Sequence, residues 1–200
     1  MAVPRTMKAN FTKASLIVPE TRIVAGLLLD RISPADWKQA IEVDNVLQKK
    51  TRLTAVTYAT LARSRLQVVP TTLWQLARNG SHAEATDVAL AATVKFSPLF
   101  GQFLRDVLRD EFRRFSTALA PTAWDDYIDQ QLRAHPEIEP YNASTRIKLR
   151  QNGMRMLQEA GFVLDTKHLA LRRRPIEPAV RQLLEAAGER QILECLLICP

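Results

Sequence analysis

The stretch ASTRIKLRQNGMRMLQEAGFV, residues 143–163, predicts an amphipathic helix over 144–160 that ends at Gly161. Its apolar side chains share one broad face: Ile147, Leu149, Gly153, Met154, Met156, Leu157 and Ala160. The opposite face carries Lys148, Gln151, Asn152, Arg155 and Gln158. Lys, Arg, Asn and Gln are the side chains that donate hydrogen bonds to phosphates and base edges, so this face is typical of a nucleic-acid-binding helix.

The residues after this helix alternate between apolar and polar types. The stretch FVLDTKHLALRRR, residues 162–174, is centred on a turn-like Asp-Thr-Lys and predicts a short β-hairpin that ends in Arg172, Arg173 and Arg174. A helix followed by a basic hairpin is the order of a winged helix, in which one element enters a groove and the other contacts the neighbouring backbone. A last helix is expected over 178–197.

The first third of the chain predicts a second helical module. Helices are expected over 19–31, where Pro19 fits the first turn, and over 33–45, where Ser33 and Pro34 form a typical start. A third helix is expected over 52–67, with Thr51 as its cap. Three short helices with a basic, threonine-bearing third one follow the plan of a helix-turn-helix module.

The whole chain is therefore expected to be mainly α, with two small domains of helix-turn-helix and winged-helix type. Further helices are predicted over 72–78, 82–96, 97–115 and from Thr122 onward, while HPEIEPYN, residues 135–142, reads as a linker. We expect an N-terminal helix-turn-helix-like domain over 1–80, a central helical segment over 81–139 and a C-terminal winged-helix-like domain over 140–200.

The positive charge of the chain is concentrated in two blocks. The net charge is +7, and residues 45–83 contain six cations and no acid. Residues 140–174 contain eight cations and two acids. Like charges on one helix repel by about 0.2–0.5 kcal/mol a pair, so two such blocks indicate a polyanionic partner. A solvated basic face is the alternative explanation of either block taken alone.

Nucleic acid is the partner that these residues lead us to expect, with contacts mainly to phosphates and a steep dependence on salt. The predicted nucleic-acid-binding residues are Lys49, Lys50, Arg52, Thr54, Arg63, Arg65, Arg146, Lys148, Arg150, Gln151, Asn152, Arg155, Arg172, Arg173 and Arg174. Gln151 and Asn152 are the candidates for base edges. Tyr58, Trp74 and Trp124 could stack on bases, but aromatic residues at helical spacing are more often core residues.

Residue patterns of catalysis and of cofactor binding are missing from the sequence. The histidines are isolated, and there is no Gly-rich phosphate loop. The acids of WDDYID, residues 124–129, suit the start of a helix better than a two-metal site. Cys195 and Cys199 suit two small core residues. With no apolar run long enough for a membrane span, we expect a cytoplasmic, non-enzymatic protein without a cofactor, a metal, a small-molecule substrate or a membrane partner.

Two stretches together resemble the BrxA family of the BREX (bacteriophage exclusion) systems. They are VDNVLQKKTRLTAVTYATLARSRL, residues 43–66, and STRIKLRQNGMRMLQEAGFV, residues 144–163. The matching positions are Asp44, Asn45, Gln48, Arg65 and Leu66 in the first, and Thr145, Leu149, Gln151, Leu157, Glu159, Ala160 and Gly161 in the second. The likeness extends from about residue 11 to about residue 185.

The resemblance implies a mostly helical, two-part protein that binds double-stranded DNA and has no catalytic residues. It also implies a role in phage defence beside a DNA methyltransferase and other BREX components. A second hypothesis is an adaptor that docks another BREX subunit through the acidic middle of the chain and the apolar LECLLICP, residues 193–200, without binding DNA itself. Structured RNA is a third possible partner.

Overall fold

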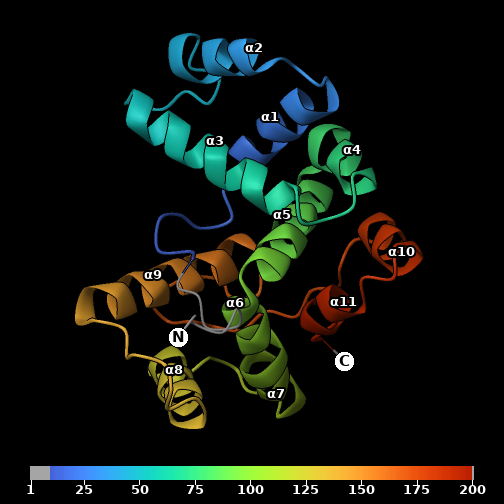
Figure 1. Cartoon of the computed structure of the whole chain (residues 1–200). Helices are drawn as coiled ribbons and strands as arrows, with labels where there is room; N and C mark the ends of the chain where they lie inside the picture. Colours follow the sequence, from blue (N-terminus) through green and yellow to red (C-terminus); the bar gives the residue numbers. More distant parts are fainter. Residues whose placement is uncertain (1–9, 200) are drawn as a thin grey trace. The chain divides into compact units, whose positions relative to one another are not determined.

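The computed structural model describes residues 10–199 and is mainly helical. The chain forms two compact units (Figure 1). Unit 1 combines the N-terminal residues through Ser15 with Ser97–Ile176 and Arg190–Pro200. Unit 2 combines Leu16–Phe96 with Glu177–Glu189. The three consecutive segments expected from the sequence, 1–80, 81–139 and 140–200, do not coincide with these units, because Ser97–Ile176 lies in one unit and Glu177–Glu189 joins Leu16–Phe96 in the other.

Unit 2 is built around a buried central helix. All residues of α5 from Ala85 to Val94 are buried, and α1, α3, α4 and α10 contact it. The elements of this unit are α1 (Val18–Leu29), α2 (Pro34–Lys38), η2 (Gln39–Val43), α3 (Arg52–Leu66), α4 (Thr72–Asn79), α5 (His82–Phe96) and α10 (Pro178–Ala186). Helix α2 begins where it was predicted, because the Ser33 hydroxyl accepts the backbone N–H of Asp36.

Helix α3 confirms the prediction of a helix over 52–67. The Thr51 hydroxyl accepts the backbone N–H of Thr54 at 3.2 Å, which satisfies one of the free donors of the first turn. Three of its buried residues are alanines, and the buried set is Ala55, Ala59, Leu61, Ala62, Arg65 and Leu66. Small side chains let neighbouring backbones approach, so α3 packs against both α1 and α5.

The helix predicted over 178–197 is divided into two, and this prediction is corrected. Gly188 has a φ of 70°, a left-handed conformation that glycine adopts without strain and that ends a helix. Before it, α10 is held on unit 2 by Asp87, which accepts the backbone N–H of Glu177 at 2.7 Å, and by an ion pair between Lys95 and Glu189. After it, α11 (Arg190–Leu196) packs in unit 1.

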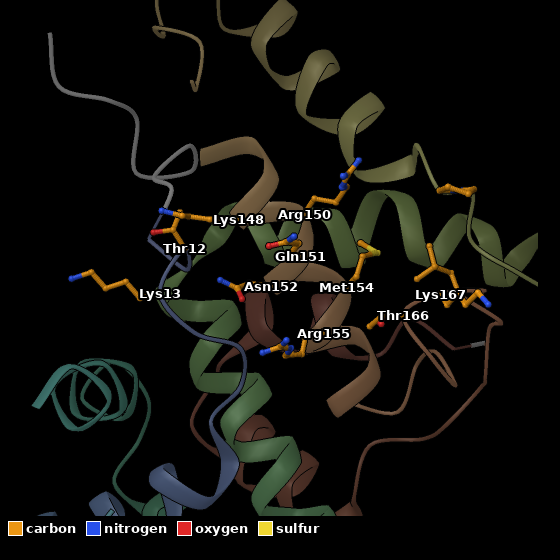
Figure 2. Close-up of a pocket in the computed structure, with 12 residues that line it drawn as sticks. Thr12, Lys13, Lys148, Arg150, Gln151, Asn152, Met154, Arg155, Thr166 and Lys167 are labelled. Atoms are coloured by element: carbon orange, nitrogen blue, oxygen red, sulfur yellow. The ribbon is translucent and has the colours of Figure 1, made fainter. Parts of the chain in front are cut away.

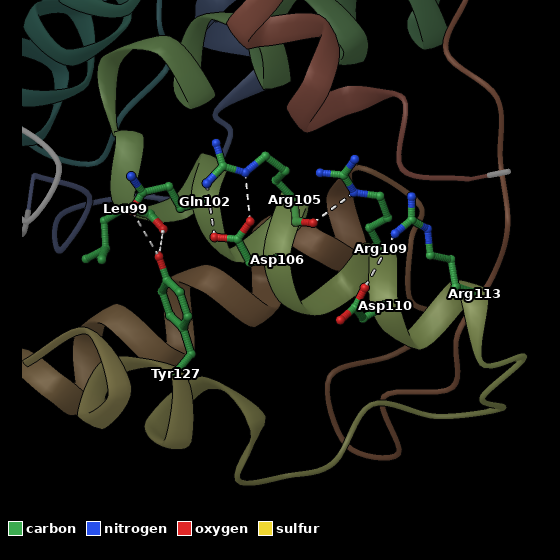
Figure 3. Close-up of polar contacts among 8 residues, drawn as sticks. All are labelled: Leu99, Gln102, Arg105, Asp106, Arg109, Asp110, Arg113 and Tyr127. Carbon is green, nitrogen blue, oxygen red and sulfur yellow. Dashed lines mark hydrogen bonds and ion pairs between the residues drawn. The ribbon is translucent and has the colours of Figure 1, made fainter. Parts of the chain in front are cut away.

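Unit 1 begins with a continuous helical run in place of the single α-helix predicted over 97–115. The run consists of α6 (Pro98–Phe103), the π-helical turn η3 (Leu104–Leu108) and α7 (Arg109–Arg113). Helices α8 (Ala123–Ala134) and α9 (Ala143–Glu159) follow. Figure 3 shows how α8 is tied to α6: the Tyr127 hydroxyl donates to the Leu99 carbonyl at 3.0 Å. Burial raises the pKa of Tyr127 far above its usual range.

An aromatic cluster forms the core of unit 1. Trp124 and Phe103 lie with ring centroids 4.8 Å apart, and Phe11 meets the edge of Trp124 at 5.8 Å. Helix α9 approaches this cluster through Gly153, where an added Cβ would lie 3.3 Å from the Trp124 ring. The buried Leu149, Met156 and Leu157 complete the face that was predicted to be apolar, whereas Ile147 is 48% exposed.

The β-hairpin predicted over 162–174 is not confirmed as a pair of strands. Within residues 10–199 the pairing is reduced to two isolated antiparallel bridges, Val163 with Leu171 and Ala118 with Ala170. The chain still reverses at this point, because the Asp165 carboxylate accepts the backbone N–H groups of Lys167 and His168. These bonds lower the pKa of Asp165.

Candidate nucleic-acid interface

A basic groove of about 670 Å³ opens on unit 1 between α9, the N-terminal residues and the turn at 165–168 (Figure 2). Five cations line it, and none of the twelve residues around it carries a carboxylate. Met154, Leu169 and Pro121 supply its apolar part. The polar lining residues are Thr12, Lys13, Lys148, Arg150, Gln151, Asn152, Arg155, Thr166 and Lys167.

Helix α9 presents its polar residues to this groove because its opposite face is anchored in the core. Asn142 caps the helix by accepting the backbone N–H of Thr145 at 2.8 Å. Leu149, Met156 and Leu157 are fully buried. The helical period then places Lys148, Gln151 and Arg155 on the exposed side, and all three line the groove. The three residues that the sequence placed on one polar face therefore lie together along the groove.

Two of the predicted arginines of α9 are paired with acids of α8. Arg146 contacts Asp129 at 2.8 Å and Arg150 contacts Asp125 at 3.0 Å. The hydrogen bond from Arg146 lowers the pKa of Asp129. In contrast, no carboxylate among residues 10–199 pairs with Lys148 or Arg155. The free positive charge of α9 is thus confined to the side that faces the groove.

Asn152 has a different position from the one expected of a base-reading residue. Its side-chain amide donates to the Phe11 carbonyl at 2.8 Å and holds the N-terminal residues against α9. Thr12 and Lys13 are consequently groove residues that the sequence prediction missed. The only signal of their role was the apolar Phe11 among polar neighbours, which belongs to no periodic element.

The three consecutive arginines after the turn do not line the groove. Arg173 donates to the Phe112 carbonyl and lies over the Phe115 ring at 4.7 Å, while Arg174 lies over the Phe162 ring at 5.6 Å. Arg172 is exposed. The turn contributes Thr166 and Lys167 to the groove instead, because its tip, rather than its base, lies beside α9.

The N-terminal basic block is largely neutralised by acids from outside the block. Lys49 pairs with Glu20, and Arg52 pairs with Glu42. Arg65 was predicted to contact nucleic acid, and this prediction is corrected. Only 1% of it is exposed, and its guanidinium donates to the Leu16 carbonyl at 3.3 Å.

The remaining predicted residues of this block lie at or near the surface of unit 2. Arg63 stacks on Trp37. The Thr54 hydroxyl lies 2.8 Å from that of Thr51, and Lys50 is exposed.

Three further features bear on function in the described part of the chain: metal-ligand groups, cysteine thiols and membrane-spanning helices. Within residues 10–199 no group of three or more His, Cys, Asp or Glu side chains is placed to hold a metal ion. Burial raises the pKa of the Cys195 thiol to about 11, so it is a poor nucleophile at neutral pH. Over the same residues, no helix is both long and apolar enough to cross a bilayer.

Comparisons with known proteins agree over nearly the whole chain. A family model described as BrxA matches residues 6–188. The BREX protein BrxA of Paramagnetospirillum magneticum is 38% identical over 198 residues, which span 99% of each chain. The BREX protein BrxA of Escherichia coli O9:H4 is 29% identical over 90% of this chain and 85% of that relative. A crystal structure of a protein from Magnetospirillum magneticum has a TM-score of 0.87 and 37% identity, and covers 98% of this chain and 100% of that one.

Proposed function

Because the chain belongs to the BrxA family of BREX proteins, we propose that it is a non-catalytic, double-stranded-DNA-binding accessory protein of a BREX phage-defence system. In that role it supports methylation of host DNA and restriction of phage, beside the methyltransferase and other BREX components. The observation that carries the proposal is the groove of unit 1, in which Lys13, Lys148, Arg155 and Lys167 have no acid partner among the described residues.

The order of elements in unit 1 supports the proposal. The helical run α6–α7 is followed by the bridge at Ala118, by α8 and α9, and by the turn whose bridge joins Val163 to Leu171. This is the order of a winged-helix domain, with α9 in the place of the recognition helix and the turn in the place of the wing. The groove between α9 and the turn tip is where such a domain would receive a nucleic-acid backbone.

The cations of the groove come from three separate parts of the chain, which suits a rigid polyanion better than a small ligand. Lys148 and Arg155 lie two helical turns apart, which is about 10 Å along the axis of α9. Phosphates of one DNA strand recur about every 3.4 Å along the helix axis, so two cations this far apart can each meet a phosphate of their own. Gln151 lies between them at the groove and is the candidate for a contact with a base edge.

Titration of a short duplex at several salt concentrations tests the proposal. We expect the affinity to fall steeply with salt, and Lys148→Glu/Arg155→Glu to abolish binding at salt concentrations where the parent protein binds. Lys38→Glu, on the exposed surface of α2, serves as the control for a general loss of positive charge. Absence of duplex binding by the parent protein, or tighter binding to structured RNA in direct competition, would refute the proposal.

A protein adaptor is the second candidate, and exposed apolar side chains on unit 2 favour it. Leu53 is 77% exposed and Val43 is 66% exposed, next to the paired Arg52 and Glu42. The C-terminal segment is a weaker docking surface than expected, because Ile192, Cys195, Leu196 and Ile198 are buried. Co-purification with another BREX subunit after nuclease treatment, lost in Leu53→Ser/Val43→Ser, is the result that this function predicts.

A further inference from the structure

Residues Asn10–Ser15, the N-terminal strap, run along α9 and form one wall of the groove (Figure 2). The strap is fastened at three points. Phe11 is fully buried against Phe100 and Trp124, with ring centroids 5.9 and 5.8 Å away. Its carbonyl accepts the Asn152 amide at 2.8 Å, and the Ser15 hydroxyl donates to Glu159 at 2.7 Å. A segment held in this way is part of the fold.

Between these fastening points the strap exposes the residues that face the groove. Lys13 is exposed, and no carboxylate among residues 10–199 pairs with it. Thr12 precedes it at the groove, and in Figure 2 both lie on the same side of α9 as Lys148. The anchors at Phe11 and Ser15 fix the backbone on both sides of Lys13, so the strap adds one cation to those that α9 presents to the groove.

We propose that the strap is a built part of the duplex-binding site, in which Lys13 contacts a phosphate and Asn152 is the positioning residue that holds the strap in place. The inference rests on the proposed DNA-binding function and adds two residue roles to it. Asn152 then acts on DNA through Lys13. An amide that already donates to the Phe11 carbonyl is not aimed at a base edge, which leaves Gln151 as the base-facing amide of α9.

A double-mutant cycle on the full chain tests these roles. Lys13→Ala should weaken duplex binding about eightfold at 0.1 M monovalent salt and reduce the salt slope by about 0.9, the value of one phosphate contact. Asn152→Ala should weaken duplex binding by no more than this factor. When Lys13→Ala is already present, adding Asn152→Ala should not lower the duplex affinity further. Lys38→Ala is the control, since Lys38 is an exposed lysine of α2 outside unit 1.

Limited proteolysis gives a measurement that does not depend on DNA. Trypsin should cleave after Lys13 faster in Asn152→Ala than in the parent protein, because the strap loses its bond to α9. An unchanged cleavage rate would show that this bond does not hold the strap. Lys13 is exposed, so we expect Lys13→Ala to retain the fold. The duplex affinity of Lys13→Ala therefore decides the role of the strap even if Asn152→Ala does not fold.

The outcomes separate this inference from the proposed function. If the parent protein fails to bind duplex, both are overturned. If Lys148→Glu/Arg155→Glu abolishes binding but Lys13→Ala leaves the salt slope unchanged, the function stands and the strap is not part of the site. If Asn152→Ala lowers the duplex affinity by the same factor with and without Lys13→Ala, then Asn152 contacts DNA directly and its proposed positioning role is wrong.

Discussion

Replacing Lys148 and Arg155 with glutamine should weaken duplex binding far more than the same change at Arg146 and Arg150. All four residues lie on α9, and each double variant removes two positive charges. The difference lies in their partners: Arg146 and Arg150 contact Asp129 and Asp125 at 2.8 and 3.0 Å, whereas Lys148 and Arg155 meet no carboxylate among residues 10–199. A cation already neutralised by protein releases few counterions from DNA.

The expected size of the effect follows from counterion release. Each lost phosphate contact lowers the slope of log K against log salt by about 0.9, so Lys148→Gln/Arg155→Gln should lower it by about 1.8. The corresponding loss of affinity is roughly 60-fold at 0.1 M monovalent salt and roughly ninefold at 0.3 M. For Arg146→Gln/Arg150→Gln we expect the slope of log K against log salt to change by less than about 0.5. The two arginines are already paired with carboxylates of α8, so they contribute little to the free positive charge.

Fluorescence anisotropy of a labelled duplex, measured at four or more salt concentrations, provides the slopes. Circular dichroism melting of each variant checks that the fold is retained. Equal slope changes in the two double variants would refute the reasoning, since pairing with α8 would then not decide which cations face DNA. A larger change in Arg146→Gln/Arg150→Gln would show that the paired arginines, and not the unpaired cations, carry most of the duplex contacts.

Three further changes test the packing and the ion pairs. Arg65→Met should lower the free energy of unfolding by about 1.5–3 kcal/mol in urea titrations, because a buried charged donor is lost, while leaving the salt slope of duplex binding unchanged. Gly153→Ala should lower stability by about 1 kcal/mol despite its better helix propensity, since the new Cβ meets the immobile Trp124 ring. NMR titration should show a pKa of Asp129 below its usual value of 3.8, and this pKa should rise again in Arg146→Ala. The ion pair stabilises the fold above pH 3.8, and this stabilisation is lost as the pH falls through the lowered pKa.

The sequence alone determined the helical class and the bounds of α3 and α9, because the signals that set them are local. Thr51 caps α3, Asn142 precedes α9, and Gly161 with a φ of 79° ends it. The apolar period of α9 also identified which of its residues face outward. Lys148, Gln151 and Arg155 were placed on the polar face of this helix, and all three are exposed, since amphipathic periodicity requires no knowledge of distant residues.

Only the tertiary structure decided which positive charges remain free. The block from 45 to 83 contains no acid in sequence, yet Glu20 and Glu42 reach Lys49 and Arg52 from other elements. The strap joins α9 across more than a hundred residues through the bond from Asn152 to Phe11. A net charge sums over the chain, whereas an electrostatic field depends on the distances between charges, and those distances exist only once the helices have packed.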